Sequence, residues 1–118
     1  MFRKRDIDVK WSSIRNRARK DGDEMEIDII LENEEFVIAI EVKSTLNVKE
    51  VDWFLNKLEL FKEFFPRFKK HKLLGAVAGI VIEERADRYA YRRGLFVIVQ
   101  SGETVKILND EKFKPREW

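Results

Sequence analysis

A period of two in the hydrophobic pattern opens the chain and predicts strands. Residues 6–19 alternate between charged and other side chains, as in a long strand or bent ribbon. Beyond a turn signal at 21–23, the segments 25–32 and 36–43 predict two further strands, the second of them dominated by β-branched residues. Residues 33–35 supply a tight turn between these two strands. The first third of the chain therefore predicts a meander of three strands.

The spacing of apolar residues changes beyond Thr45 to steps of three, four and seven residues, which is typical of a helix. We predict a helix from residue 48 to about residue 65, because Asn47 is a suitable N-cap and Glu50 follows three residues later. Pro66 should end this helix, because its ring cannot continue the helical hydrogen bonds.

The last third of the chain returns to strands. Residues 73–82 are continuously apolar, as in a strand that is buried on both faces. Residues 84–93 predict a short helix closed by Gly94, and one or two final strands follow over 95–100 and 103–108. The long helix is a crossover, which favours parallel pairing of the strands on either side of it. The predicted fold class is α/β, with a mixed central sheet flanked by helices.

The composition restricts the chemistry that is available. A length of 118 residues suits one domain, spanning residues 1–118. The absence of cysteine excludes disulfides, cysteine-based zinc sites and thiol nucleophiles. Because His71 is the single histidine, no multi-histidine metal cage can form, so any metal ion must be bound by oxygen.

Membrane and secretory segments are not evident in the sequence. No apolar run approaches the roughly 20 residues that cross a bilayer, and the N-terminal segment lacks the apolar core of a secretory signal. We therefore expect a soluble, cytoplasmic protein without a membrane partner.

The formal net charge of +2 is distributed unevenly. Residues 1–20 carry eight basic side chains against two acidic ones, so the rest of the chain has a net charge of −4 (+2 minus +6). This asymmetry indicates contact with a polyanion near the N-terminus, although a solvated charged surface explains it equally well. The basic residues of this segment are Arg3, Lys4, Arg5, Lys10, Arg15, Arg17, Arg19 and Lys20.

Ionisable residues interrupt two of the predicted apolar strands. Asp28 lies in the first of them, and Glu41 and Lys43 end the second. Alternate side chains share a face of a strand, so Glu41 lies with Lys43, and Glu26 lies with Asp28. A hairpin loop of two residues would place Asp28 opposite Ala39 or Glu41, and either register brings the three ionisable groups to one face. A loop of odd length would separate them.

Two adjacent carboxylates repel each other and raise each other's pKa, which a bound divalent cation relieves. Mg²⁺ or Mn²⁺ suits such hard oxygen ligands and could activate water against a phosphodiester. Lys43 would then orient or deprotonate the water, or offset charge on the phosphate. The alternative is a salt bridge at the strand ends, in which Lys43 pairs with Glu41 or Asp28.

The motif formed by these strands resembles that of a known superfamily. Glu26-Ile27-Asp28-Ile29-Ile30 precedes Ile40-Glu41-Val42-Lys43-Ser44, with twelve residues between Asp28 and Glu41. This pattern resembles the core motif of the PD-(D/E)XK, or restriction-endonuclease-like, superfamily. Within that superfamily the chain is similar to uncharacterised archaeal and bacterial proteins with a nuclease-like C-terminal domain. The resemblance spans about residues 6–108.

The resemblance implies a restriction-endonuclease-like core with the element order βββαβαβ. It also implies an Mg²⁺-dependent nuclease, a DNA endonuclease or its nuclease domain. Asp28 and Glu41 would bind Mg²⁺ or Mn²⁺, and Lys43 would assist the attacking water. Glu26 would be either a carboxylate that supports the metal ligands or a plain hairpin residue.

The chain departs from the superfamily pattern at two points. Ile27 stands where the motif has proline, a common variation. The superfamily also has a helix before its first strand that often supplies a further acid, and here that helix is missing or truncated. Either the sequence is a domain of a longer protein, or the helix and its ligand are lost.

Two peripheral features bear on partners. Arg15, Arg17 and Arg19 would project from one face of a strand that runs towards the metal site, and with Lys20 they are candidate contacts for DNA or RNA phosphates. A charged edge strand that discourages aggregation is the alternative.

The predicted long helix has more aromatic residues than one helix face can bury, which indicates a homodimer formed through this helix. A wide core face under a neighbouring element is the alternative. The residues are Trp53, Phe54, Phe61, Phe64 and Phe65.

Three functional hypotheses follow from the sequence. The first is a metal-dependent endonuclease that uses Asp28, Glu41 and Lys43. The second is a catalytically inactive nucleic-acid-binding or assembly module with the same fold. The third is a small structural protein whose motif is a salt bridge. Fold alone does not separate them, because function depends on the site.

Overall fold

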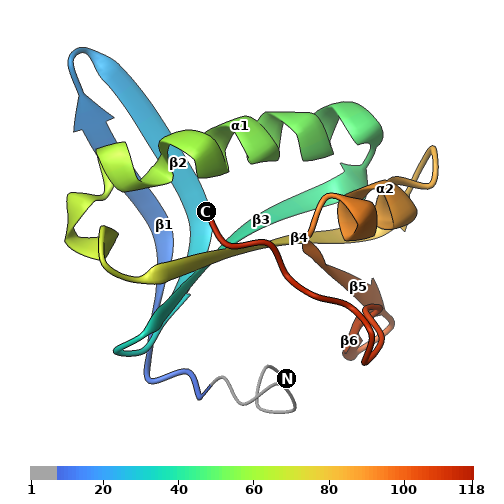
Figure 1. Ribbon diagram of the computed structural model, residues 1–118. Coiled ribbons are helices and arrows are strands. Elements are labelled where there is room, and N and C mark those ends of the chain that lie inside the picture. Colours follow the sequence, from blue (N-terminus) through green and yellow to red (C-terminus); the bar gives the residue numbers. More distant parts are fainter. Residues whose placement is uncertain (1–7) are drawn as a thin grey trace.

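The computed structural model describes residues 8–118 and has an α/β fold (Figure 1). The described residues form one six-stranded sheet in which the strands lie in sequence order. The strands are β1 (Trp11–Lys20), β2 (Asp23–Glu32), β3 (Phe36–Leu46), β4 (Lys72–Ile82), β5 (Phe96–Ser101) and β6 (Thr104–Ile107). The helices are α1 (Val48–Phe64), the 3-10 turn η2 (Pro66–Phe68) and α2 (Ala86–Arg92). This order confirms the predicted succession of elements.

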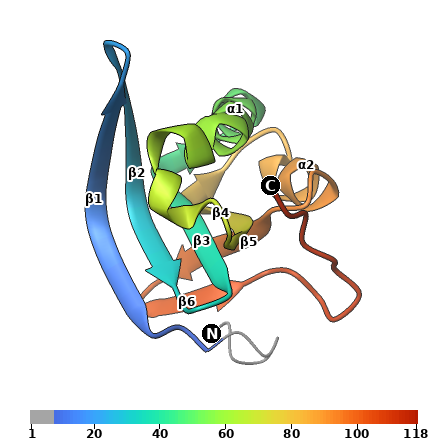
Figure 2. The ribbon, with the colours of Figure 1, turned by 60° about the vertical axis from the view of Figure 1, so that its left-hand side comes forward.

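The sheet is mixed, as predicted. The pairs β1–β2, β2–β3 and β5–β6 are antiparallel, whereas β3–β4 and β4–β5 are parallel. Both helices pack on the same face of the sheet (Figures 1 and 2) and share a core with it. On the opposite face, a second core includes Phe113 from the C-terminal segment, whose ring lies 5.0 Å from that of Phe96.

The helix α1 begins where the sequence predicts. The side chain of Asn47 accepts a hydrogen bond from the Glu50 N–H at 2.9 Å and so satisfies one of the free donors of the first turn. The apolar residues of α1 at helical spacing then face the sheet, where Val51, Leu55 and Leu58 are buried.

The aromatic residues of α1 mostly belong to the core. Phe54 and Phe61 are fully buried, and Phe64 and Phe65 pack against the same cluster. Trp53 is the exception, since 61% of it is exposed. A wide core face therefore accounts for four of the five aromatic residues that indicated self-association.

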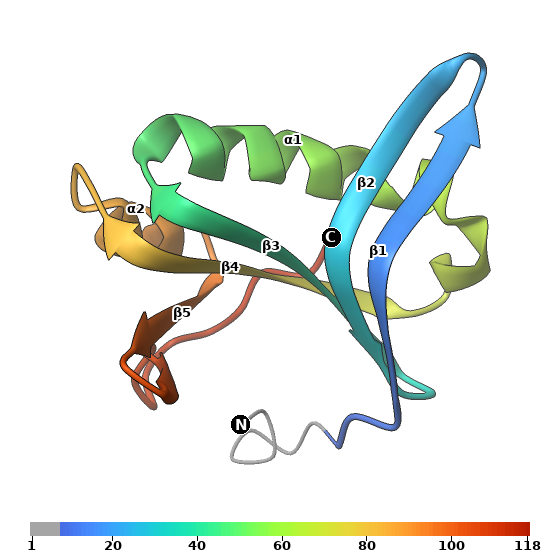
Figure 3. The same cartoon turned by 180° about the vertical axis from the view of Figure 1, so that it is seen from behind.

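The β1–β2 ribbon bends sharply and leaves the plane of the sheet to rise beside α1 (Figure 3). Met25 and Ile27 pack in the helix-side core, whereas Ile29 packs against the core of the opposite face. Odd-numbered residues of a regular strand would share one face, so β2 changes face between Ile27 and Ile29. Asp28 lies at this change of face.

The bend has a counterpart in β1. Arg15 has a φ of 53°, which is unusual for a residue other than glycine. The flanking pairs Ile14↔Ile29 and Asn16↔Ile27 set Arg15 opposite Asp28. The Asn16 side chain donates to the carbonyl oxygens of Ser13 and Ile27, which supports the local distortion. β1 also begins at Trp11, later than the predicted start at residue 6, and residues 6 and 7 lie outside the described part of the chain.

Gly75 of β4 permits close approach of α1 to the sheet. A Cβ added at Gly75 would lie 2.6 Å from Leu58 Cδ1 and 2.7 Å from Leu95 Cδ2. We expect Gly75→Ala to lower the free energy of unfolding by about 1–3 kcal/mol through overpacking. Urea denaturation measures this change, with Ser12→Ala on the exposed face of β1 as the control. A midpoint equal to that of the wild type would contradict the prediction.

Among the described residues, no helix is long and apolar enough to cross a membrane.

Candidate functional site

The β2–β3 hairpin adopts one of the two registers that the sequence allows. Its loop is Glu34-Glu35, and the pairs run from Glu32↔Val37 to Ile29↔Ile40. The Asn33 side chain accepts hydrogen bonds from the N–H groups of Glu35 (2.8 Å) and Phe36 (2.7 Å), which stabilises a tight loop without glycine. Continued by one residue, the same register would set Asp28 opposite Glu41.

The Asp28 side chain replaces the backbone pairing at this position. Its Oδ2 accepts a hydrogen bond from the Val42 N–H at 2.8 Å. The backbone ladder between β2 and β3 ends one residue earlier, at Ile29↔Ile40, because the ribbon bends away there. The carboxylate of Asp28 thus bridges the gap between the diverging strands and is held beside Glu41.

Glu41 is the single buried charged residue among the described residues, with 6% exposed. Its Oε2 lies 3.0 Å from the Nζ of Lys57 on α1. Burial raises the pKa of Glu41 above its usual value, the Lys57 ammonium opposes that rise, and the neighbouring Asp28 carboxylate adds to it. The two carboxylates are therefore close enough to interact, as the sequence predicted.

Lys57 was not among the residues singled out from the sequence. Its Nζ also donates to the backbone carbonyl oxygen of Glu26 at 2.9 Å. It therefore connects α1 to β2 and β3 at the point where these two strands separate. Lys57 lies two helical turns after Glu50, so the two residues share a face of α1. That spacing is the one sequence signal that could have identified it.

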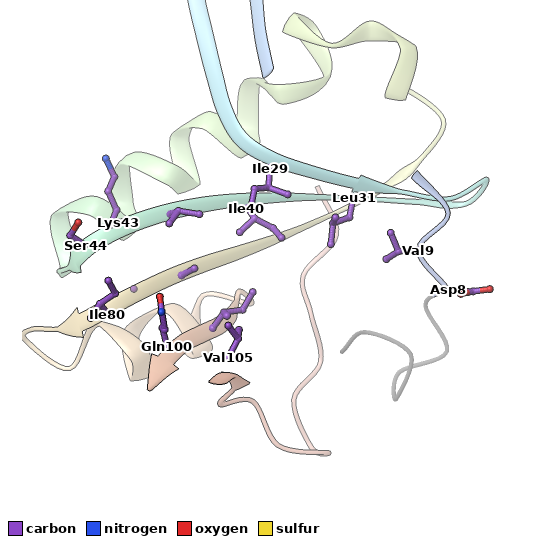
Figure 4. Close-up of a pocket in the computed structure, with 14 residues that line it drawn as sticks. Asp8, Val9, Ile29, Leu31, Ile40, Lys43, Ser44, Ile80, Gln100 and Val105 are labelled. Carbon is purple, nitrogen blue, oxygen red and sulfur yellow. The ribbon is translucent and has the colours of Figure 1, made fainter. Parts of the chain in front are cut away.

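Lys43 reaches α1 rather than the carboxylates. Its Nζ lies 3.4 Å from Glu50 Oε2, and both side chains are partly exposed. Figure 4 shows the Lys43 side chain on the same side of β3 as α1. The structure does not show the alternative salt bridge from Lys43 to Glu41 or Asp28, since the partner of Lys43 is Glu50. Of the three groups that an even hairpin loop was expected to bring to one face, Asp28 interacts with Glu41, and Lys43 extends towards α1.

The side chain of Glu26 points elsewhere. Its Oε2 lies 3.5 Å from Nε of Arg17 across the ribbon. Of the two interpretations, Glu26 as a hairpin residue fits the side chain, whereas its backbone carbonyl contacts Lys57.

The predicted basic stripe is partly neutralised. Arg17 and Arg19 pair with Glu24 at 3.8 and 3.3 Å, and Lys20 pairs with Glu63 of α1 at 3.2 Å. Arg15 is exposed and lies at the bend. Lys10 pairs with Glu34 at 2.6 Å. Arg3, Lys4 and Arg5 lie outside the described residues.

Two grooves of about 760 Å³ each border this region. One is largely apolar and lies on the face of the sheet opposite α1, with Ile29, Ile40 and Val105 in its lining (Figure 4). Lys43 and Gln100 border the same groove. The other runs between the β1–β2 ribbon and α1, and its lining includes Lys57 and Trp53. The carboxylate pair lies on the helix side, so the second groove is the one next to it.

The donor set suits a hard divalent cation. The described residues contain no group of three or more His, Cys, Asp or Glu side chains placed to hold a metal ion. Mg²⁺ commonly binds through one or two carboxylates and takes its other ligands from water and substrate phosphates. The pair of Asp28 and buried Glu41 fits that pattern.

Comparisons with known proteins give one similarity. No family model and no curated protein matches the chain significantly. The chain is similar to the crystal structure of the protein of unknown function AF1548, with a TM-score of 0.53 and 18% sequence identity. The similarity covers 88% of this chain and 53% of that one, so the chain spans about half the length of the similar protein. At this level of identity the similarity shows the fold alone.

Proposed function

We propose that this protein is a metal-dependent nuclease that hydrolyses phosphodiester bonds, most simply in DNA. The observation that carries the proposal is the juxtaposition of the Asp28 and Glu41 carboxylates at the point where β2 and β3 separate. Holding a buried carboxylate against a second one costs free energy unless another group compensates it. A divalent cation bound between the two carboxylates would compensate this cost.

The proposed roles follow from position. Asp28 and Glu41 hold Mg²⁺ or Mn²⁺ through their carboxylate oxygens. When bound, such an ion polarises the phosphodiester and lowers the pKa of water. Lys43 follows Glu41 on the same face of β3, and its ammonium, now 3.4 Å from Glu50, is the group that would orient the attacking water or offset phosphate charge.

The proposal also includes a nucleic-acid substrate bound along the β1–β2 ribbon and a homodimeric assembly. Arg15 and its neighbours Arg17, Arg19 and Lys20 would contact the phosphates of DNA, or of RNA, along the β1–β2 ribbon. A homodimer would bring two such sites to one duplex, and the exposed Trp53 of α1 is available for that contact. We place this activity in the cytoplasm.

A plasmid-nicking assay tests the proposed function. Supercoiled DNA incubated with the full chain should be converted to nicked or linear forms in Mg²⁺ or Mn²⁺ and left intact in EDTA. A single-stranded RNA of similar length in parallel reactions distinguishes the two substrates. Intact DNA and RNA under every metal condition would refute the proposal.

The ion pairs of the site favour a second candidate. Glu41 is already compensated by Lys57, and Lys43 by Glu50. These pairs would suit a catalytically inactive module that keeps the fold and binds nucleic acid or a protein partner. That module would bind DNA in a gel-shift experiment without cutting it, and would bind no Mn²⁺ at Asp28 and Glu41.

The affinity for Mn²⁺ is expected to rise with pH by up to about tenfold per unit and then to level off, because binding requires Glu41 to lose its proton. Burial raises the pKa of Glu41, so the rise should continue above the usual Glu value of about 4.3. Isothermal titration calorimetry at several pH values measures this. An affinity that is constant from the usual Glu value upward would contradict the prediction.

The raised pKa of Glu41 also makes the stability of the metal-free protein depend on pH. The folded state keeps the Glu41 proton at pH values where the unfolded state has lost it, so stability should fall as pH rises through this window. The variant Glu41→Gln removes the titrating group and provides the control.

A further inference from the structure

Lys57 occupies a position that the proposed cation would also take. Its ammonium is 3.0 Å from Glu41 Oε2, and Glu41 in turn interacts with Asp28. We propose that Lys57 is a built-in counterion that partly neutralises the carboxylate pair in the metal-free protein and competes with the divalent cation for Glu41. This proposal rests on the proposed function only for the location of the metal site.

The contacts of Lys57 hold its ammonium beside the carboxylates, as the role of a counterion requires. Its second hydrogen bond, 2.9 Å long, goes to the backbone carbonyl oxygen of Glu26. That oxygen keeps the ammonium at the carboxylate pair without adding a charge of its own. Lys57 therefore supplies one positive charge to two carboxylates, which leaves the pair incompletely compensated.

The Lys57 ammonium also has solvent-accessible space into which it can move. The Lys57 side chain is 30% exposed, whereas that of Glu41 is 8% exposed. Lys57 lines the groove between the β1–β2 ribbon and α1, and Glu24 and Glu63 line the same groove, where they pair with Arg19 and Lys20. The flexible stem of a lysine lets the ammonium rotate into this groove when a cation takes its place. A buried ion pair enclosed on all sides would not permit such an exchange.

The alternative is that Lys57 is a purely structural tie between α1 and the sheet. The two roles differ in what happens when its charge is removed. A structural tie predicts lower stability and no gain in metal affinity. A competing counterion predicts lower stability of the metal-free protein together with tighter metal binding, because the cation no longer displaces a positive charge.

Mn²⁺ titration of the full chain without nucleic acid tests the proposal. Lys57→Met, which keeps the length of the side chain and removes its charge, should raise the association constant for Mn²⁺ by about tenfold. Its melting temperature should be lower than that of the wild type without metal and should recover at saturating Mn²⁺. Lys57→Arg keeps the charge and should stay near the wild-type affinity.

Two variants complete the design. Lys49→Met removes an equal charge from α1, and Lys49 pairs with no carboxylate among the described residues, so its Mn²⁺ affinity should match the wild type. Lys57→Gln keeps a hydrogen-bond donor and serves if Lys57→Met does not fold.

The outcomes separate this proposal from the proposed function. Tighter Mn²⁺ binding by Lys57→Met or Lys57→Gln, specific to position 57, supports the counterion role even if no variant cuts DNA. Unchanged or weaker binding overturns it, even if the wild type is an active nuclease. Absence of Mn²⁺ binding in both the wild type and the position 57 variants also overturns it.

Discussion

Asp28→Asn is expected to abolish detectable DNA cleavage while leaving the protein folded. The substitution removes one of two charged oxygen ligands, and the charge stabilisation supplied by a metal ion is worth several kcal/mol in the transition state. A loss on the order of 10³ in cleavage rate follows from about 4 kcal/mol. Mn²⁺ affinity should fall by at least about tenfold for the same reason.

The fold should tolerate this change for a specific reason. The side-chain oxygen of asparagine can still accept the hydrogen bond that Asp28 receives from the Val42 N–H at 2.8 Å. Repulsion between Asp28 and Glu41 also disappears. We therefore expect a melting temperature at or above that of the wild type to accompany the loss of cleavage, measured by thermal denaturation and plasmid nicking on the same sample.

Asp21→Asn is the matched control for Asp28→Asn. Asp21 lies in the exposed turn between β1 and β2 with a φ of 51°, which asparagine also adopts readily. This variant should cut DNA at the wild-type rate. If Asp28→Asn also retains wild-type cleavage, any nuclease activity of the protein must arise elsewhere.

The sequence left the parity of the β2–β3 hairpin open, because a loop of odd length would have separated the three ionisable groups. A two-residue loop sufficed to place Asp28, Glu41 and Lys43 on one side, and both even registers gave that result. The choice between the registers was not predictable, because no glycine marks the loop. It depends on the Asn33 side chain, whose hydrogen bonds to two backbone N–H groups select Glu34-Glu35.

The ion-pair partners of the charged residues could not be predicted from the sequence. They depend on how α1 is rotated about its axis over the sheet, which is determined by packing of Phe54 and Phe61 rather than by local pattern. That rotation brings Lys57 to Glu41 and Glu50 to Lys43. A pattern within one strand suggested the nearer partners of Lys43, and the structure replaced them with a partner from the helix.

The bend of the β1–β2 ribbon could not be predicted from the sequence either. The alternation of Arg15, Arg17 and Arg19 predicted one continuous face, but Arg15 adopts a left-handed conformation at the position opposite Asp28. Nothing in the residue types marks this bend, since arginine has no preference for positive φ. The bend matters because it opens the ladder and leaves the Asp28 carboxylate to bond Val42.

Lys43→Met is expected to reduce cleavage by about 10²–10⁴-fold, the usual contribution of a positioned side chain to proton transfer. Its Mn²⁺ affinity should not fall, because Lys43 contributes no ligand and its removal makes the site less positive. This split between rate and affinity distinguishes Lys43 from Asp28, whose replacement lowers both. Lys106→Met on the exposed face of β6 is the matched control and should leave both quantities unchanged.

The ion pair with Glu50 supplies the competing explanation for Lys43. If Lys43 served only that pair, its loss would change stability by no more than roughly 1 kcal/mol, because both side chains are partly exposed. Cleavage would then persist in Lys43→Met. Glu50→Gln separates the two cases further, since it breaks the same ion pair but leaves the Lys43 ammonium free. Cleavage that survives in Glu50→Gln and is lost in Lys43→Met assigns the chemistry to Lys43 itself, whereas equal loss in both variants assigns it to the pair.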